Sequence, residues 1–179
     1  MATFKINGKN FATQDGTGAA TVHSDVVFPA GHVLQVVQNE RTEANDLTTS
    51  YVNLYEVSIT LKSASSDVYG FFYFQYYFDS NAAFGVKVYR NNSATVTTSH
   101  TAVWTKNTSN STGPYSWFAS GTTYGVSSVN PKDSLSGFSI GDTLYYGFFA
   151  RKYDSNAVQI GSDTDTDGFI SSTLMEVQK

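Results

Sequence analysis

Cysteine is absent from this chain, which excludes disulfide bonds, thiol catalysis and the common zinc motifs. Charged residues are scarce at 15%, and their balance leaves a net charge of −4. Nucleic-acid-binding proteins neutralise phosphates with clustered Lys and Arg, so we expect no nucleic-acid partner. No stretch approaches ~18 consecutive apolar residues, so we expect no membrane insertion. The N-terminal residues lack the apolar core of a secretory signal.

Aromatic and β-branched residues are what the sequence has in abundance. Its 13 Phe and 12 Tyr argue against a disordered chain, because disordered segments are poor in aromatic residues. Together with 14 Gly, they leave little room for helix-forming residues, so we expect no helix bundle. The length of 179 residues fits one domain with a sizeable core. These features predict an all-β protein, an antiparallel β-sandwich of jelly-roll type.

A seam near Pro29 divides the chain into two parts. Before it, short strand patterns flank Asn7-Gly8, a dipeptide that is favoured in tight hairpins. Pro29 itself begins a turn, because proline presets φ for the first central position of a turn. We therefore expect an N-terminal arm over residues 1–28, a hairpin plus an extended segment, and a β-sandwich domain over residues 29–179.

Strand patterns recur along the expected domain. The cleanest is residues 55–61, where apolar residues alternate with Glu56, Ser58 and Thr60, as in a half-buried strand. A polar, turn-prone stretch over residues 105–113 predicts an exposed loop. The other expected strands lie at residues 32–38, 51–54, 84–89, 94–98, 124–129, 143–153 and 169–177.

The aromatic segment 68–78 (VYGFFYFQYYF) has no polar face. Pleating sends successive side chains to opposite faces of a strand. A single sandwich buries only one of these two faces in its core. The second face is therefore expected to meet another sheet or another subunit, with sugar stacking on the Tyr-rich face as the alternative. The subunit interface of a homotrimer is assigned to Phe72, Phe74, Tyr76 and Phe78, and the opposite face carries Phe71, Tyr73, Gln75 and Tyr77.

One motif resembles a catalytic signature. Residues 137–141 match the G-x-S-x-G elbow of hydrolases, which needs a strand before it, a helix after it and a later histidine. All three histidines precede Ser139, and a strand is expected to follow it. A turn at Gly141-Asp142 is the better interpretation. We expect no catalytic residue and no enzymatic activity.

The acidic run before the last strand begins like a calcium-binding loop. Its carboxylates stand at alternate positions in Asp163, Asp165 and Asp167, and Gly168 follows. The twelfth position holds Leu174 where such a loop needs glutamate. The pattern leaves a cation site open and favours a solvated acidic turn. The histidines show no metal-ligand spacing, and no cofactor is expected.

Both ends of the expected domain resemble a known family. The segment FPAGHVLQVVQ (residues 28–38) and the final strand SSTLMEV (residues 171–177) are similar to marine, cyanophage-type phage structural proteins that are often labelled tail-fibre-like. In addition, FSIGDTL (residues 138–144) is similar to a step in trimeric jelly rolls of the tumour-necrosis-factor and complement-head type. The resemblance implies a trimeric virion protein that is made in the host cytoplasm.

Two functions remain open for such a protein. One is a trimeric capsid-decoration protein on the virion surface, bound to other virion proteins through the arm of residues 1–28. The other is a receptor-binding tail-fibre or tail-tip adhesin that recognises host polysaccharide. An arm of this length reaches roughly 95 Å when fully extended, too short for a long shaft, which favours decoration. The candidate glycan contacts are Trp104, Tyr115, Trp117 and Tyr124, and burial of the two tryptophans as loop anchors is the alternative.

Overall fold

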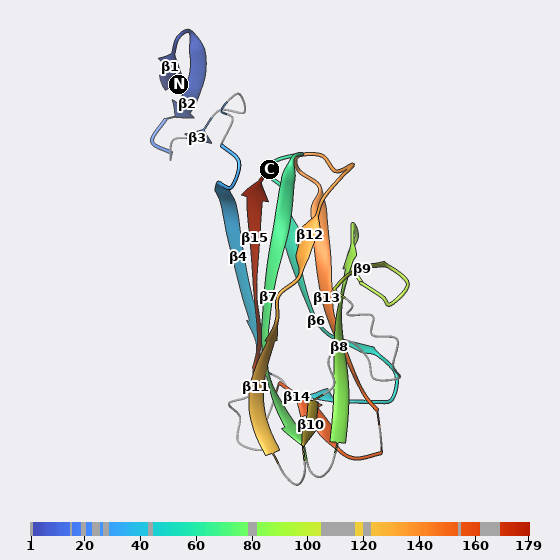
Figure 1. The fold of residues 1–179 in the computed structure, drawn as a ribbon. Coiled ribbons are helices and arrows are strands. Elements are labelled where there is room, and N and C mark those ends of the chain that lie inside the picture. The colour runs from blue at the N-terminus through green and yellow to red at the C-terminus, as the bar shows by residue number, and fades with distance from the viewer. Residues whose placement is uncertain are drawn as a thin grey trace.

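The computed structural model describes residues 2–14, 16–18, 21–22, 26, 29–42, 45–78, 82–104, 117–119, 123–153, 155–161 and 169–179. Within these ranges the secondary structure is entirely β-strand, bridged by turns and bends (Figure 1). None of the described residues forms a helix that could cross a membrane.

The first three strands form a small sheet of their own: β1 (Ala2–Ile6), β2 (Lys9–Gln14) and β3 (Thr21–Val22). The expected hairpin turn is present, because Asn7 and Gly8 both have positive φ values, of 49° and 78°. Figure 1 shows this small sheet apart from the other strands, past the end of the molecule at which β4 (Val33–Arg41) begins. Most of the extended segment expected up to residue 28 lies outside the described residues.

The remaining described strands form two antiparallel sheets that pack together as a β-sandwich (Figure 1). The larger sheet contains β4 (Val33–Arg41), β5 (Asn45–Asp46), β7 (Ser66–Phe78), β11 (Thr123–Val129), β12 (Lys132–Ser134), β14 (Val158–Ile160) and β15 (Ile170–Gln178). Its order is β4-β15-β7-β14-β5, with β11 and β12 also paired to β7. The smaller sheet contains β6 (Val52–Thr60), β8 (Ala82–Asn91), β9 (Thr101–Trp104), β10 (Trp117–Ala119) and β13 (Thr143–Lys152). Its order is β10-β8-β13-β6, with β9 also paired to β8. The predicted all-β antiparallel sandwich is therefore confirmed.

Aromatic rings from both sheets fill the core between them. Phe72 and Phe74 of β7 are fully buried, and their ring centroids lie 5.9 and 5.0 Å from that of Phe148 on β13. Phe84 of β8 completes the contact at 6.2 Å from Phe74. Burial of each such ring stabilises the fold by roughly 1.5–3 kcal/mol.

This core corrects the assignment of the subunit interface. Phe72 and Phe74 face the opposite sheet of the same chain, so neither side chain is available to a second subunit. Tyr76 lies on the same face, with its ring 5.4 Å from Phe84, and the side chain of Phe78 lies outside the described residues. The face of β7 that solvent reaches is the other one, which carries Phe71 and Tyr73.

One predicted strand is wrong. Residues 94–98 belong to a loop between β8 and β9 that folds over the outer face of the smaller sheet. The Glu56 carboxylate accepts the backbone N–H of Val96 at 2.8 Å, and the Asn53 amide donates to the Val96 carbonyl at 3.3 Å. Gly147 lies beneath, where an added Cβ would come within 3.0 Å of Val96. The side chains of Glu56 and Asn53 thus form the hydrogen bonds with the Val96 backbone that a neighbouring strand would form in the predicted sheet.

Candidate functional site

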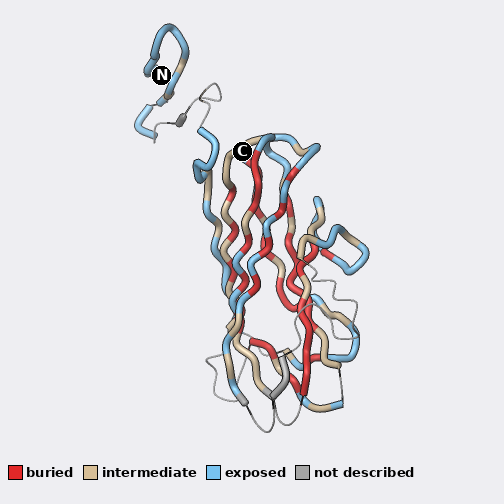
Figure 2. The backbone as a smooth tube through the Cα atoms, in the orientation of Figure 1, coloured by how far each residue is buried: buried red, intermediate tan, exposed pale blue. Residues whose placement is uncertain are grey.

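The outer face of the seven-stranded sheet carries an exposed apolar surface. The strand register places its members, Val36, Phe71, Tyr73, Tyr124 and Val126, on the same side of β4, β7 and β11. They are 53, 43, 39, 50 and 54% exposed, respectively. Figure 2 shows the exposed and intermediate positions along these strands. Monomeric proteins rarely leave a large contiguous apolar surface to water, so this outer apolar face is a candidate interaction surface.

Neighbouring rings hold the outer apolar face in shape. Tyr73 stacks on Phe169 with ring centroids 5.4 Å apart, and Tyr77 lies 4.7 Å from Tyr124. A polar groove of about 550 Å³ lies along residues 38–40 of β4 and 171–173 of β15, next to Tyr73. The groove is lined by Gln38, Asn39, Glu40, Ser171, Ser172 and Thr173. An apolar centre beside a polar margin is the usual anatomy of a protein–protein interface.

A polar clamp joins the two sheets through the core. Asp133 of β12 accepts hydrogen bonds from Arg90 Nη1 of β8 at 2.8 and 2.9 Å, and from the Tyr146 hydroxyl of β13 at 2.9 Å. The Arg90 and Asp133 side chains are only 14 and 10% exposed. The Arg90 guanidinium also lies over the Phe138 ring, 4.8 Å from its centroid. The cation therefore has a fixed position.

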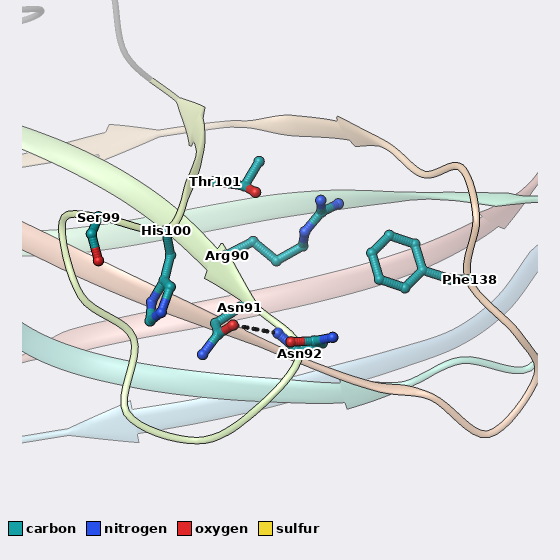
Figure 3. A pocket seen from close by; sticks show the side chains of 7 residues that line it. All are labelled: Arg90, Asn91, Asn92, Ser99, His100, Thr101 and Phe138. Carbon is teal, nitrogen blue, oxygen red and sulfur yellow. Dashed lines mark hydrogen bonds between the residues drawn. The ribbon is translucent and has the colours of Figure 1, made fainter.

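The clamp ends at a pocket on the surface, which Figure 3 shows with its lining side chains. The pocket has a volume of about 340 Å³ and opens where β8 ends and the loop to β9 returns. Guanidinium, amide, imidazole and hydroxyl groups line it beside one aromatic ring. The lining residues are Arg90, Asn91, Asn92, Ser99, His100, Thr101 and Phe138.

The clamp makes the fold sensitive to alkaline pH. Burial and the adjacent Asp133 carboxylate raise the pKa of Tyr146 well above its usual value. An unfolded tyrosine ionises near pH 10, so this stabilisation is complete below pH ~10 and is lost as pH rises beyond it. Between pH 10 and 12, we expect the free energy of unfolding to fall less steeply with pH for Tyr146→Phe than for the wild type. Chemical denaturation over that range measures this, with Tyr145→Phe on the same strand as the control, and an unchanged slope would contradict it.

Two of the four predicted glycan contacts, Trp104 and Tyr124, have described side chains. Trp104 lies on β9 of the smaller sheet, where it packs partly buried against the core. Tyr124 lies on β11 of the larger sheet, within the outer apolar face. Tyr115 and the side chain of Trp117 are outside the described residues, as is the whole loop expected over residues 105–113. The two predicted contacts whose side chains are described, Trp104 and Tyr124, thus belong to different sheets.

The other sequence candidates have simple structural surroundings or lie outside the described residues. Ser139 sits in a turn in which its N–H donates to the Asp142 carboxylate at 2.8 Å, and β13 begins directly afterwards. The expected turn is thus present, and no helix follows it. Asp163, Asp165 and Asp167 lie outside the described residues, and no group of metal-binding side chains occurs within the described ones.

Sequence reasoning missed the buried charges. Glu176 of β15 is fully buried, and its carboxylate accepts the backbone N–H groups of Lys62 and Ser63 at 2.9–3.0 Å. The Ser66 hydroxyl donates to it at 2.8 Å, so this carboxylate shapes the turn between β6 and β7. Along the sequence, Glu176 looks like any polar residue of an alternating strand. Only its partners more than 100 positions away reveal the role.

Asp67 forms a second ionic group, near the first residue of β7. Its carboxylate lies 3.0 Å from both Lys132 and Lys179. Burial raises the pKa of Asp67, but the hydrogen bonds and charges of the two ammonium groups outweigh it and hold the pKa below its usual value. The two ion pairs therefore tie Lys132 of β12 and Lys179, which follows β15, to Asp67 on the strand between them, β7.

Comparison with known proteins adds no relative. No protein-family model matches the chain, and no curated protein matches it significantly. Its function therefore has to be inferred from its residues and from the surfaces described above.

Proposed function

We propose that this chain is a non-enzymatic structural protein of a bacteriophage virion, a homotrimer that decorates the virion surface. The resemblance of residues 28–38 and 171–177 to phage structural proteins supports this role. In the fold, most of the first segment lies in β4 and the second in β15, and these strands pair side by side. The two similar segments are thus one continuous part of the sheet, as expected for a shared building block.

The outer apolar face is the observation that carries the proposal. Its aromatic and aliphatic side chains belong to a sheet whose other face already forms the core, so a second copy of the chain is the partner that would cover them. Apolar, aromatic centres of this kind are typical of subunit interfaces. In the proposed homotrimer, the subunit interface thus still involves the aromatic strand β7, but through the face that carries Phe71 instead of the face that carries Phe72.

The N-terminal sheet supports attachment to other virion proteins. Phe4, Ile6 and Phe11 are exposed on it, and the rings of Phe4 and Phe11 meet edge to face at 5.7 Å. A sheet of three short strands needs packing on one face for stability. Docking of this sheet on a capsid or tail protein would supply it. Deletion of residues 1–27 should then leave the sandwich folded and abolish incorporation into particles.

Native mass spectrometry of the full chain tests the assembly. At micromolar concentration we expect a trimer for the wild type and a monomer for Phe71→Glu, because burial of an unpaired carboxylate in an interface costs several kcal/mol. Lys62→Glu is the control, because it places the same negative charge on an exposed turn and should stay trimeric. Val103→Glu is unsuitable as a control, because it would disrupt the core. A monomeric wild type, or a trimeric Phe71→Glu, would refute this interface.

The adhesin that recognises host polysaccharide remains the second candidate, favoured by the polar pocket beside Arg90. Copy number separates the two roles. Quantitative protein analysis of purified particles should find hundreds of copies of a decoration protein. A few tens of copies would instead identify a tail-fibre or tail-tip protein, and absence from the particle would reject both.

A further inference from the structure

The pocket of Figure 3 contains hydrogen-bond donors that none of the described residues uses. Nη1 of Arg90 is engaged by Asp133, whereas Nε and Nη2 donate to no acceptor among the described residues. Because a guanidinium carries five N–H groups, three of them stay available. Asp133 is buried on β12 and is not among the lining residues, whereas Arg90 is, so the ion pair presents its positive end to the pocket.

His100 adds a second donor. Its Nδ1 accepts the backbone N–H of Thr97 at 2.9 Å, so the proton of the neutral ring lies on Nε2. No described residue accepts a hydrogen bond from Nε2, and the ring lines the pocket. The local network therefore sets the tautomer that leaves this edge of the imidazole as a donor.

Three further polar side chains of the lining differ in their hydrogen bonds. The Asn91 carboxamide is held at both ends, because its oxygen accepts the Asn92 N–H and its nitrogen donates to Ser93, each at 2.9 Å. The side chains of Asn92 and Thr101 form no such bonds with described residues and are exposed. An amide and a hydroxyl are thus free to pair with hydroxyl groups of a ligand.

The size and the donors together indicate one class of ligand. A volume of about 340 Å³ lies at the lower end of ligand pockets and suits one sugar ring. Arginine pairs with carboxylates in a fork of two parallel hydrogen bonds, and none of the described lining residues is a carboxylate that would compete for these N–H groups. We propose that this pocket binds a hexuronate residue, with its carboxylate on Arg90 and its hydroxyls on Asn92, His100 and Thr101.

Calorimetric titration of the full chain with glucuronate, glucose and acetate tests the site. We expect millimolar binding of glucuronate and at least tenfold weaker binding of glucose, which lacks the carboxylate, and of acetate, which lacks the hydroxyls. Equal affinity for glucose would overturn the role of Arg90. Equal affinity for acetate would overturn the sugar assignment, and failure of all three to bind would overturn the site.

Variants locate the binding in the pocket. Arg90→Lys keeps a cation beside Asp133 but removes the fork, and we expect about tenfold weaker glucuronate binding; Asn92→Ala should weaken it severalfold. Thr98→Ala lies in the same loop outside the lining and should bind as the wild type does. Should Arg90→Lys unfold, Asn92→Ala decides, and unchanged binding by Asn92→Ala would overturn the proposal. These titrations use the isolated chain, so their failure leaves the virion role standing.

Discussion

Replacement of Asp133 by alanine is expected to lower the free energy of unfolding by about 3–5 kcal/mol, the usual cost of removing one partner of a buried ion pair. The loss arises because Arg90 would remain as an uncompensated charge between the sheets, and the Tyr146 hydroxyl would lose its acceptor. Denaturant unfolding at one fixed protein concentration measures the change. The fixed concentration matters because an oligomer is stabilised by mass action.

Asp67→Ala is the matched control for that experiment. Asp67 is also an aspartate with two polar partners, but both partners, Lys132 and Lys179, are lysines that reach solvent. Water can take over the hydrogen bonds of these ammonium groups, so the loss of stability should be clearly smaller. Equal losses for the two variants would contradict the view that burial of Arg90, rather than loss of an ion pair, sets the cost.

Local patterns predicted the strands where packing agrees with them. The alternation at residues 55–61 lies mostly within β6, the aromatic run within β7, and the Gly141-Asp142 turn precedes β13. The pattern at residues 94–98 failed because Val96 is buried without a neighbouring strand. Its apolar contacts are Tyr89 and Phe149, and its backbone partners are side chains of β6. Periodicity cannot distinguish these two ways of burying a valine.

The choice between the two faces of β7 could not be made from the strand alone. Both faces are aromatic, so the decision depends on the register with β15, which places Ile170 and Leu174 on the side of Phe74 and Phe72. Asp133, Arg90 and Glu176 were hidden for a related reason. Arg90 is 43 positions from Asp133 in the sequence, and Glu176 is 110 positions from Ser66. Pairings over such distances follow only from the assembled sheets.

Phe74→Ala should lower the free energy of unfolding by about 3–5 kcal/mol, because truncation of a buried ring loses its transfer free energy and leaves a cavity. Phe74 touches Phe84 and Phe148 within one chain, so this loss should be the same at every protein concentration. Phe71→Ala alters the opposite, exposed face of the same strand and is the matched control.

The concentration dependence separates the two faces of the strand. In dilute protein, where a trimer dissociates, Phe71→Ala should unfold almost as the wild type does, since its ring is already 43% exposed. In concentrated protein it should fall below the wild type, because the trimer then contributes to wild-type stability. A Phe71→Ala deficit that is independent of concentration would assign both faces to the monomer and remove the subunit interface. A Phe74→Ala deficit that appears only in concentrated protein would reverse the two roles.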